Sequence, residues 1–302
     1  MGRLDGKVAI VFGAGPNIGG TIAHCLAKEG AKIVVSDRSQ AAADGTAEFL
    51  TGRGFDAFAT AGDATSEEDV GRIVAAGVEH YGYVDTMVNL AGAVVWGAVT
   101  EMRLEDFTRC TTSFLSAGFL TTKYTARALL AQNRKGCLIH LLSTAAHFGE
   151  ASGTAYTAAK AGLLNFARSA AMDLAHAGIR VNTITPCALE HQLWTNMREE
   201  MTKGEPPRTR EFYSRDDYLK MIPLQRFPRA SDLGWAAVYL ASDEAEFLTG
   251  VDIPVDGGLR FKYPTWRPGD FTGVNVRDYL ESLKITRYGE PGDDFWPAMG
   301  GR

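Results

Sequence analysis

The sequence predicts an α/β fold: a doubly wound parallel sheet of about seven strands, followed by a C-terminal extension. Two observations predict it. Short runs rich in β-branched residues alternate with longer amphipathic stretches, which is typical of right-handed β-α-β units. Polar residues or a proline also follow several of these runs, as expected where parallel strands end at one edge of a sheet.

Each element has a local signal. Strands are expected at residues 7–12, 32–36, 56–60, 85–89, 138–142, 179–184 and 251–255. Helices are expected at residues 17–28, 40–51, 67–81, 104–132, 154–176 and 232–240. Gly30 marks the end of the first helix, and Ser66 is the expected N-cap of the third. The strand expected at residues 56–60 has the weakest sequence pattern of the seven.

Five residues fall at or just beyond the ends of five predicted strands: Asp37, Asp63, Asn89, Ser143 and Pro186. In a parallel sheet these positions line one edge, although they come from distant parts of the chain. Sheets of this kind bind ligands beyond the carboxyl ends of their strands. We therefore expect the functional site at this edge.

Composition indicates one large domain, expected at residues 1–261, in a chain of 302 residues that is 45% hydrophobic. The net charge is −5 and there is no basic block, so the sequence does not indicate nucleic-acid binding. We find neither a membrane-length apolar run nor a secretion signal, and we expect a cytoplasmic protein that is not bound to a membrane. Four widely spaced cysteines favour reduced thiols over disulfides or metal ligands.

The regular alternation breaks at residues 189–228, which carry Trp194, Met197, Met201, Phe212, Tyr213 and Tyr218. This composition favours a lid over an apolar ligand, and short helices packed on the surface are the alternative. Residues 262–302 form the extension. Its aromatic residues favour packing on the domain or on a neighbouring subunit over a disordered tail.

The most informative residues are Ser143, Tyr156 and Lys160. Tyr156 and Lys160 lie four residues apart on a predicted helix and so share a face. A nearby ammonium favours the phenolate and lowers a phenol pKa that is normally about 10. Ser143 can hydrogen-bond a substrate oxygen while the phenol gives or takes its proton. These residues predict acid–base catalysis.

A glycine-rich turn, FGAGPNIGG, lies between the first predicted strand and its helix. Gly13, Gly15 and Gly19 would let the backbone approach a dinucleotide pyrophosphate at the helix N-terminus. The common G-x-G-x-x-G spacing fails because Ile18 occupies its last position.

Asp37 ends the second predicted strand. A carboxylate there would accept hydrogen bonds from the adenosine ribose and repel a 2′-phosphate, which predicts NAD rather than NADP. Arg38 opposes this prediction, since a guanidinium can bind that phosphate. The alternative role for Asp37 is a cap for the following helix.

Taken together, these motifs resemble the short-chain dehydrogenase/reductase family over roughly residues 4–259. They comprise the glycine turn, NLAG, Ser143, the Y-x-x-x-K of Tyr156 and Lys160, RVNTITP and LTGVDIPVDGG. The resemblance implies a Rossmann-type domain and hydride transfer between a nicotinamide cofactor and an alcohol or carbonyl.

In the family pattern, Tyr156 would be the general acid or base and Ser143 would orient the substrate oxygen. Lys160 would bind the nicotinamide ribose and lower the tyrosine pKa. The expected cofactor-binding residues are Gly13, Asn17, Ile18, Asp37, Asp63, Ala64, Asn89, Ala91, Gly92, Tyr156, Lys160, Pro186 and Leu189. Family members also often form tetramers, so we expect a homo-oligomer, either a tetramer or a dimer.

The chain departs from the family pattern at four places. Asn17 replaces a glycine, and we expect it to tolerate left-handed backbone angles. Phe12 replaces Thr or Ser, and Cys187 and His191 replace residues near the nicotinamide. Phe114 replaces an Asn that, in the family, holds a water beside the lysine. Either Ser113 takes over that role or the proton relay is altered, and we expect reduced but real activity.

Other residues bear on the substrate or have structural alternatives. Trp96, Phe148, Trp194, Phe212 and Tyr213 favour an apolar, cyclic or aromatic secondary alcohol or ketone. His147 is expected to touch the substrate or to be a surface residue, while His140 is expected to be a core histidine.

The main reading is therefore an NAD-dependent oxidoreductase that acts on a small apolar molecule. Two alternatives stay open. One is an NADPH-dependent ketone or 3-oxoacyl reductase, which Arg38 supports. The other is a catalytically weak cofactor-binding protein, which Phe114, Cys187 and His191 support.

Overall fold

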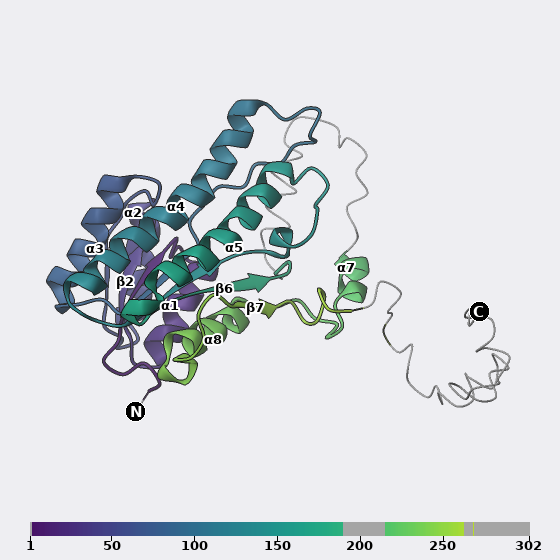
Figure 1. The fold of residues 1–302 in the computed structure, drawn as a ribbon. Coiled ribbons are helices and arrows are strands. Elements are labelled where there is room, and N and C mark those ends of the chain that lie inside the picture. Colours follow the sequence, from purple (N-terminus) through teal and green to yellow (C-terminus); the bar gives the residue numbers. More distant parts are fainter. Residues whose placement is uncertain (1, 190–214, 263–267, 269–302) are drawn as a thin grey trace, which may run out of the picture.

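The computed structural model describes residues 2–189, 215–262 and 268 (Figure 1). Its centre is a parallel sheet of seven strands in the order β3-β2-β1-β4-β5-β6-β7. The strands are β1 (Val8–Phe12), β2 (Lys32–Ser36), β3 (Ala57–Ala59), β4 (Thr86–Asn89), β5 (Gly136–Leu141), β6 (Ile179–Pro186) and β7 (Asp252–Val255).

Helices cover both faces of this sheet. They are α1 (Ile18–Lys28), α2 (Gln40–Thr51), α3 (Glu67–Tyr81), α4 (Leu104–Ala131), α5 (Thr154–Leu174) and α8 (Ala230–Ala241). A further short helix, α7 (Arg215–Met221), packs with Cys187 and Phe227 apart from the two sheet cores. Side chains of α1, α2 and α8 join one apolar core, and those of α3, α4 and α5 join the other. Figure 1 shows α4 and α5 running side by side on their face. The doubly wound architecture is confirmed.

The strands are apolar on both sides because both faces are covered. In β1, Ala9 and Val11 belong to the core beneath α1 and α8, whereas Val8, Ile10 and Phe12 belong to the core beneath α3 to α5. All five residues are buried. Phe12, where the family pattern has a hydroxyl residue, therefore fills the core.

The sequence-based elements agree with the structure to within about two residues at most ends. The Ser66 hydroxyl accepts a hydrogen bond from the main-chain nitrogen of Asp69, which confirms it as the N-cap of α3. Gly30 has a φ of 97° just after α1, a conformation that favours glycine.

The two irregular segments lie mostly outside the described residues. These include Trp194, Phe212 and Tyr213 of the expected lid and nearly all of the extension from residue 263. The described part of the lid contains α7, whose Tyr218 stacks on Phe227 with ring centroids 5.7 Å apart. The described part of this segment thus contains one short helix, which either interpretation of residues 189–228 allows.

Candidate active site

Ser143 lies two residues beyond β5 and is the N-cap of η1, a one-turn 3-10 helix (Thr144–Ala146). Its hydroxyl accepts a hydrogen bond from the main-chain nitrogen of Ala145 at 3.2 Å. It also hydrogen-bonds the phenol of Tyr156. The end of β5 and the first turn of α5 therefore bring these two hydroxyl groups together, as the sequence predicted.

Lys160 lies one turn after Tyr156 on α5 and is only 4% exposed. Its ammonium donates a hydrogen bond to the main-chain oxygen of Leu141, at the end of β5, over 2.8 Å. It also lies 5.8 Å from the centroid of the Tyr156 ring. Lysine and tyrosine thus share one face of the helix and point toward the same strand end.

Phe114 closes this group from α4. Its ring is 3% exposed, lies 4.2 Å from the Lys160 ammonium and meets the Tyr156 ring edge to face at 5.5 Å. The expected substitute, Ser113, is engaged elsewhere, because its hydroxyl bonds the main chain of Ala93 and Cys110. The first of the two readings for residue 114, that Ser113 takes over, is therefore not supported by this geometry.

Burial dominates the electrostatics of the group. It raises the pKa of the Tyr156 phenol to about 12, although the hydrogen bond with Ser143 acts in the opposite direction. It lowers the pKa of the Lys160 ammonium to about 7. Both shifts favour the neutral forms, as desolvation does for any ionisable group. An added positive charge near Tyr156 would oppose the first of these shifts.

The glycine turn fits a dinucleotide pyrophosphate. Gly13 has a φ of 80°, and a side chain at Gly19 would come within 2.0 Å of the Gly13 oxygen. These positions therefore require glycine for the helix to start so close to the strand. No side chain caps the N-terminus of α1, whereas Ser39 and Ser66 cap α2 and α3. An anion can occupy such a helix start.

Asn17 takes a different conformation from the one expected. It is the N-cap residue of α1 with a φ of −94°, so the expectation of a left-handed backbone there is wrong. Gly13 supplies the positive φ of the turn instead, so position 17 does not need a left-handed backbone. Ile18 begins the helix directly after it.

Asp37 is held by two main-chain groups just beyond β2. Its carboxylate accepts hydrogen bonds from the nitrogens of Gly15 and Ser39, at 3.1 and 3.0 Å. The cap of α2 is Ser39 rather than Asp37, so the capping alternative is wrong. Asp37 thus links the glycine turn to the end of β2, at the sheet edge where the adenosine half of a dinucleotide would lie.

The remaining predicted cofactor residues lie along the same edge of the sheet. Asn89 ends β4, and its side-chain oxygen accepts a hydrogen bond from the main-chain nitrogen of Ala91 at 3.1 Å. Asp63 accepts hydrogen bonds from Thr65, and Gly92 lies directly against Phe114. The others are Ala64, which is buried after β3, Pro186, which ends β6, and Leu189, which packs against the core under α1 and α8.

Aromatic side chains border the phenol on its open side. The Trp96 ring is 37% exposed and lies 5.8 Å from the Tyr156 ring. The loop that carries Trp96 is joined to the start of α5 by a β-bridge between Gly97 and Gly153. Phe148 is also exposed. Trp96 is therefore placed to contact a substrate bound at Tyr156.

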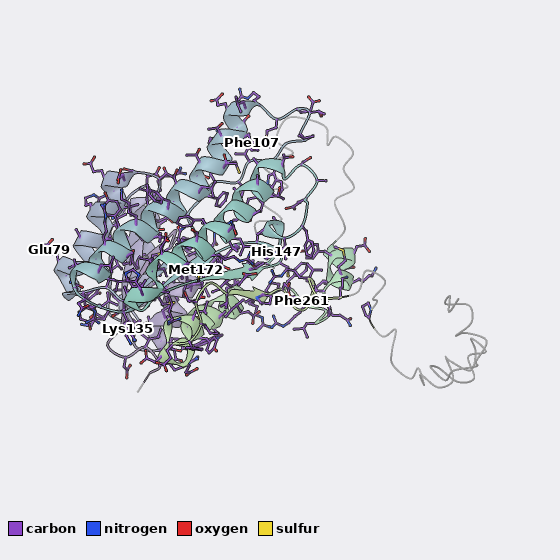
Figure 2. All side chains as sticks on the ribbon, viewed as in Figure 1. Glu79, Phe107, Lys135, His147, Met172 and Phe261 are labelled. Atoms are coloured by element: carbon purple, nitrogen blue, oxygen red, sulfur yellow. The ribbon has the colours of Figure 1, made fainter. Side chains whose placement is uncertain are left out.

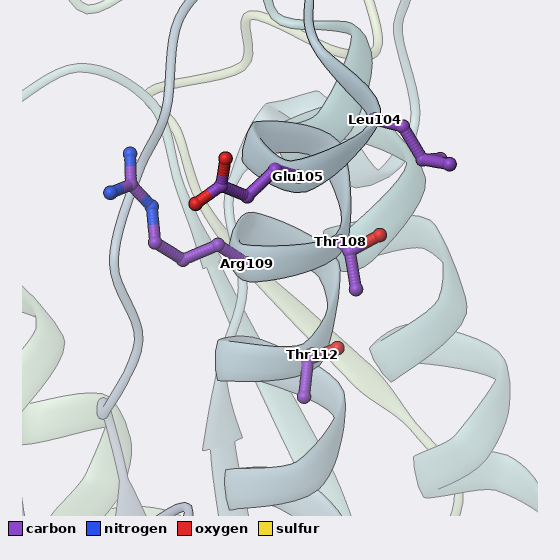
Figure 3. Close-up of a pocket in the computed structure, with 5 residues that line it drawn as sticks. All are labelled: Leu104, Glu105, Thr108, Arg109 and Thr112. Atoms are coloured by element: carbon purple, nitrogen blue, oxygen red, sulfur yellow. The ribbon is translucent and has the colours of Figure 1, made fainter.

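Two surface hollows lie close to this loop. One, of about 540 Å³, is formed by the first turns of α4: Leu104, Glu105, Thr108, Arg109 and Thr112 (Figure 3). A second, of about 240 Å³, is lined by Val99, Met102, Leu104, Phe107 and Thr154. Neither is lined by Ser143, Tyr156 or Lys160.

Sequence reasoning missed a group of charged residues beside the site. The Nε2 atom of His147 lies 3.0 Å from a carboxylate oxygen of Asp252. Arg260 bonds the same carboxylate at 2.8 Å. Asp252 is the first residue of β7, and nothing near it in the sequence indicates its contact with His147.

Three structural findings bear on other classes of site. In the described part of the chain, three or more His, Cys, Asp or Glu side chains nowhere gather as a metal site would require. Among the described helices, none combines the length and apolarity needed to cross a bilayer. The four cysteines are buried and free.

Several known proteins are similar to this chain in sequence or in structure. Residues 13–260 match the family model described as enoyl-(acyl carrier protein) reductase. A 2,5-dichloro-2,5-cyclohexadiene-1,4-diol dehydrogenase of Sphingobium indicum is 31% identical over 85% of this chain and 97% of its own length. An L-rhamnose 1-dehydrogenase (NAD(P)(+)) of Azotobacter vinelandii is 34% identical over 85% of this chain and 97% of its own.

The 3-oxoacyl-[acyl-carrier-protein] reductase of Vibrio cholerae is 30% identical over 85% of this chain and 98% of its own. Among solved structures, a protein of Burkholderia xenovorans assigned to the short-chain dehydrogenases/reductases superimposes with a TM-score of 0.76. It is 31% identical, and the match covers 87% of this chain and all of the other. The chain belongs to the short-chain dehydrogenase/reductase family and is thus an oxidoreductase that uses a nicotinamide cofactor.

Proposed function

We propose that this protein is an NAD-dependent dehydrogenase that interconverts a cyclic, largely apolar secondary alcohol and its ketone. The observation that carries the proposal is the buried group of Ser143, Tyr156 and Lys160 at the carboxyl edge of the sheet. Hydride transfer is the chemistry that a bound nicotinamide supplies. The protein's own residues must bind the substrate oxygen and move its proton.

Each of the three residues has a distinct role in this proposal. Tyr156 exchanges the proton of the substrate oxygen, and Ser143 donates a hydrogen bond that orients that oxygen. Lys160 holds a ribose hydroxyl of the cofactor and favours the phenolate of Tyr156. In the ligand-free protein, burial holds the pKa of Tyr156 at about 12. The phenol is therefore protonated until positive charge enters the site.

The cofactor preference rests on Asp37. Its carboxylate is exposed enough to meet a ribose diol and is oriented by Gly15 and Ser39. A 2′-phosphate would meet this negative charge directly. The other residues proposed to hold the cofactor are Gly13, Asn17, Ile18, Asp63, Ala64, Asn89, Ala91, Gly92, Pro186 and Leu189.

The substrate class rests on Trp96 near Tyr156, on the exposed Phe148 that follows η1, and on relatives that are named for cyclic substrates. A dehydrogenase of a chlorinated cyclohexadienediol and an L-rhamnose dehydrogenase both act on ring compounds by their names. An aromatic side chain beside the phenol suits either kind of ring. Trials of steroid, terpene, aryl and sugar alcohols separate these classes, and a strict preference for sugars would contradict the apolar part of the proposal.

A second candidate is an NADPH-dependent reductase of 3-oxoacyl or other ketone substrates. The exposed Arg38 beside Asp37 favours it, as does the similarity to the reductase of Vibrio cholerae. As in the sequence-based reading, we also propose a cytoplasmic homo-oligomer, a tetramer or dimer, with residues 1–261 as the catalytic domain. Residues 189–228 would be the substrate lid, and residues 262–302 would pack on the domain or on a neighbouring subunit.

The deciding experiment is a fluorescence titration of NADH and NADPH into the wild type and the Asp37→Ala variant. The proposal expects NADH to bind more tightly than NADPH, with NADH affinity falling about tenfold in the variant as charge-assisted hydrogen bonds are lost. Tighter binding of NADPH would favour the reductase and make Arg38 the selecting residue. Binding of neither would argue against both dehydrogenase and reductase.

A further inference from the structure

Two buried carboxylates, on β7 and just after it, form ion pairs with one guanidinium at the edge of the sheet. The side chains of Asp252, Asp256 and Arg260 are 8%, 2% and 7% exposed. Arg260 donates from Nη1 to Asp252 at 2.8 Å and from Nε to Asp256 at 3.1 Å. Buried charges of this kind are stable only when they are paired and hydrogen-bonded.

Both carboxylate oxygens of Asp252 accept two hydrogen bonds each. Its Oδ1 atom accepts hydrogen bonds from the hydroxyls of Thr183 and Thr185 on β6, at 2.8 and 2.7 Å. Its Oδ2 atom is shared by Arg260 and by Nε2 of His147 at 3.0 Å. Three other donors, from β6 and from the segment after β7, therefore set the direction in which the carboxylate can receive His147.

The imidazole of His147 acts in this network as a neutral donor. Its side chain is 23% exposed, and partial burial lowers its pKa, with Arg260 and Arg168 acting in the same direction and Asp252 against it. A neutral imidazole that donates from Nε2 suffices for the hydrogen bond. The contact therefore does not depend on a protonated histidine at neutral pH.

His147 and Ser143 are the two ends of one short element. Ser143 is the N-cap of η1 and His147 is its C-cap. Within the turn, the nitrogens of Ala146 and His147 donate to the oxygens of Ser143 and Thr144, each at 2.9 Å. A rotation of the turn at His147 is therefore transmitted directly to Ser143.

The sheet holds the other end of the turn. The nitrogen of Leu142 donates to the oxygen of Ile184 at 2.8 Å, just before Ser143. Figure 2 places His147 and Phe261, the residue after Arg260, toward the same end of the molecule, away from Lys135 at the opposite end of the strands. η1 also packs against α5 through Ala146, so the contact at His147 is the one that ties its C-terminal end to the last strand of the sheet.

We propose that His147 is a positioning residue: its hydrogen bond to Asp252 orients η1 and thereby the hydroxyl of Ser143 toward the substrate oxygen. The proposal rests on the proposed role of Ser143 and goes beyond it, since it assigns the Asp252–Arg260 pair a function in the reaction. His147 acts through the turn and needs no contact with substrate. Small displacements of a catalytic group are known to lower the rate strongly.

The test uses three variants of the full chain. His147→Ala removes the donor, and His147→Gln keeps a nitrogen at nearly the same reach. His176→Gln is the matched control, since His176 is an exposed residue of the 3-10 turn after α5. The substrate probe is cyclohexanol with NAD⁺, and thermal unfolding reports whether each variant folds.

The kinetic arm expects His147→Ala to lower kcat about tenfold with KM and NADH affinity within about twofold of the wild type. His147→Gln should restore most of this loss, and the control should match the wild type. In the Ser143→Ala background, His147→Ala should cause little further loss, because residues that act as a unit are not additive. A full additional tenfold loss there would overturn the proposal.

The second experiment measures hydrogen exchange and does not depend on enzymatic activity. Hydrogen exchange of the Ala146 and His147 amides should be about tenfold faster in His147→Ala, with the unfolding temperature unchanged and protection restored in His147→Gln. Unchanged exchange would overturn the proposal. If the wild type does not oxidise cyclohexanol but the exchange result holds, the proposed substrate class fails while the anchoring of η1 by His147 stands.

Discussion

At the scale of single residues, the site differs most from its family pattern at Phe114. The ammonium of Lys160 has two neutral partners there, a main-chain oxygen at 2.8 Å and the face of an aromatic ring at 4.2 Å. A cation–π contact that is shielded from water stabilises the charged form by about 2 kcal/mol. Burial opposes it and is the larger effect, since the pKa of Lys160 falls to about 7.

Replacing Phe114 with Asn should therefore change turnover in a defined direction. An amide can hydrogen-bond the ammonium and admit a water beside it, so protons should pass between Lys160 and solvent more readily. We expect kcat to rise about threefold in Phe114→Asn, which is a change of about 0.7 kcal/mol in the barrier. Steady-state kinetics with a saturating cofactor measure it.

Phe114→Leu is the matched control, because it removes the ring but adds no hydrogen-bonding group. Its kcat should fall or stay level rather than rise. Slower turnover in Phe114→Asn than in the wild type would contradict the idea that Phe114 limits a proton relay. Gly92 is left unchanged in both variants, because it lies directly against the wild-type Phe114 ring and a second substitution there would confuse the comparison.

At the scale of elements, β5 shows how a polar residue can stabilise a strand only while it stays neutral. His140 is fully buried in β5 and lies 3.0 Å from the hydroxyl of Thr122 on α4 and 3.4 Å from the amide of Asn89 on β4. The expectation of a core histidine is confirmed. Burial lowers the pKa of this imidazole to about 3.

Acid should therefore destabilise the protein through His140. Between pH 6.5 and pH 3 the unfolded chain binds a proton at this histidine and the folded protein does not, so stability falls as the pH falls. From pH 7.5 to pH 4.5 this contribution is about 2 to 3 kcal/mol. Urea unfolding at both pH values measures it, and His140→Gln should lose correspondingly less stability than the wild type.

The same measurement on His176→Gln provides the comparison, since that residue is exposed. It should behave like the wild type at both pH values. An equal acid loss in His140→Gln and in the wild type would mean that other groups, and not His140, cause the acid sensitivity.

Elements were predictable to different degrees for physical reasons. The pattern of apolar residues that distinguishes a strand from a helix lies within each short segment, so all seven strands could be found from the sequence. Ends were less certain: β5 begins at Gly136 because pairing with β6 extends it beyond the apolar run at residues 138–142. The helix α7 was not delimited, because seven residues in a polar segment carry too weak a pattern.

The residues of the site were predictable where they belong to a short sequence motif. Tyr156 and Lys160 are four residues apart, and Ser143 follows an apolar strand, so local spacing sufficed. The expectation for Asn17 was wrong in detail because Gly13, rather than Asn17, takes the positive φ of the turn. The contact between His147 and Asp252 spans 105 residues and leaves no local signal.

At the scale of the whole molecule, one edge of the sheet gathers residues from β1 to β6. A cofactor bound along that edge would contact the ends of many strands at once and only in the folded state. Such a ligand stabilises the fold by mass action, by about 2.7 kcal/mol at a concentration of 100 times its Kd.

NADH at that concentration should raise the melting temperature of the wild type by about 5 °C. Differential scanning fluorimetry with and without NADH measures the shift. Reduced nicotinamide mononucleotide, which lacks the adenosine half, should shift it less because it would not reach Asp37. Equal shifts with the two compounds would indicate that the end of β2 takes no part in binding.

The hydrogen bond from His147 to Asp252 also has a consequence for synthesis of the chain. A ribosome makes Asp252 105 residues after His147, so a nascent chain can already carry Ser143, Tyr156 and Lys160 while the anchor of η1 is missing. Pairing of β7 with β6 must come last, and contacts between distant residues form slowly. The oriented serine is thus a property of the finished polypeptide, and an incomplete one would hold Ser143, Tyr156 and Lys160 without the alignment that we propose.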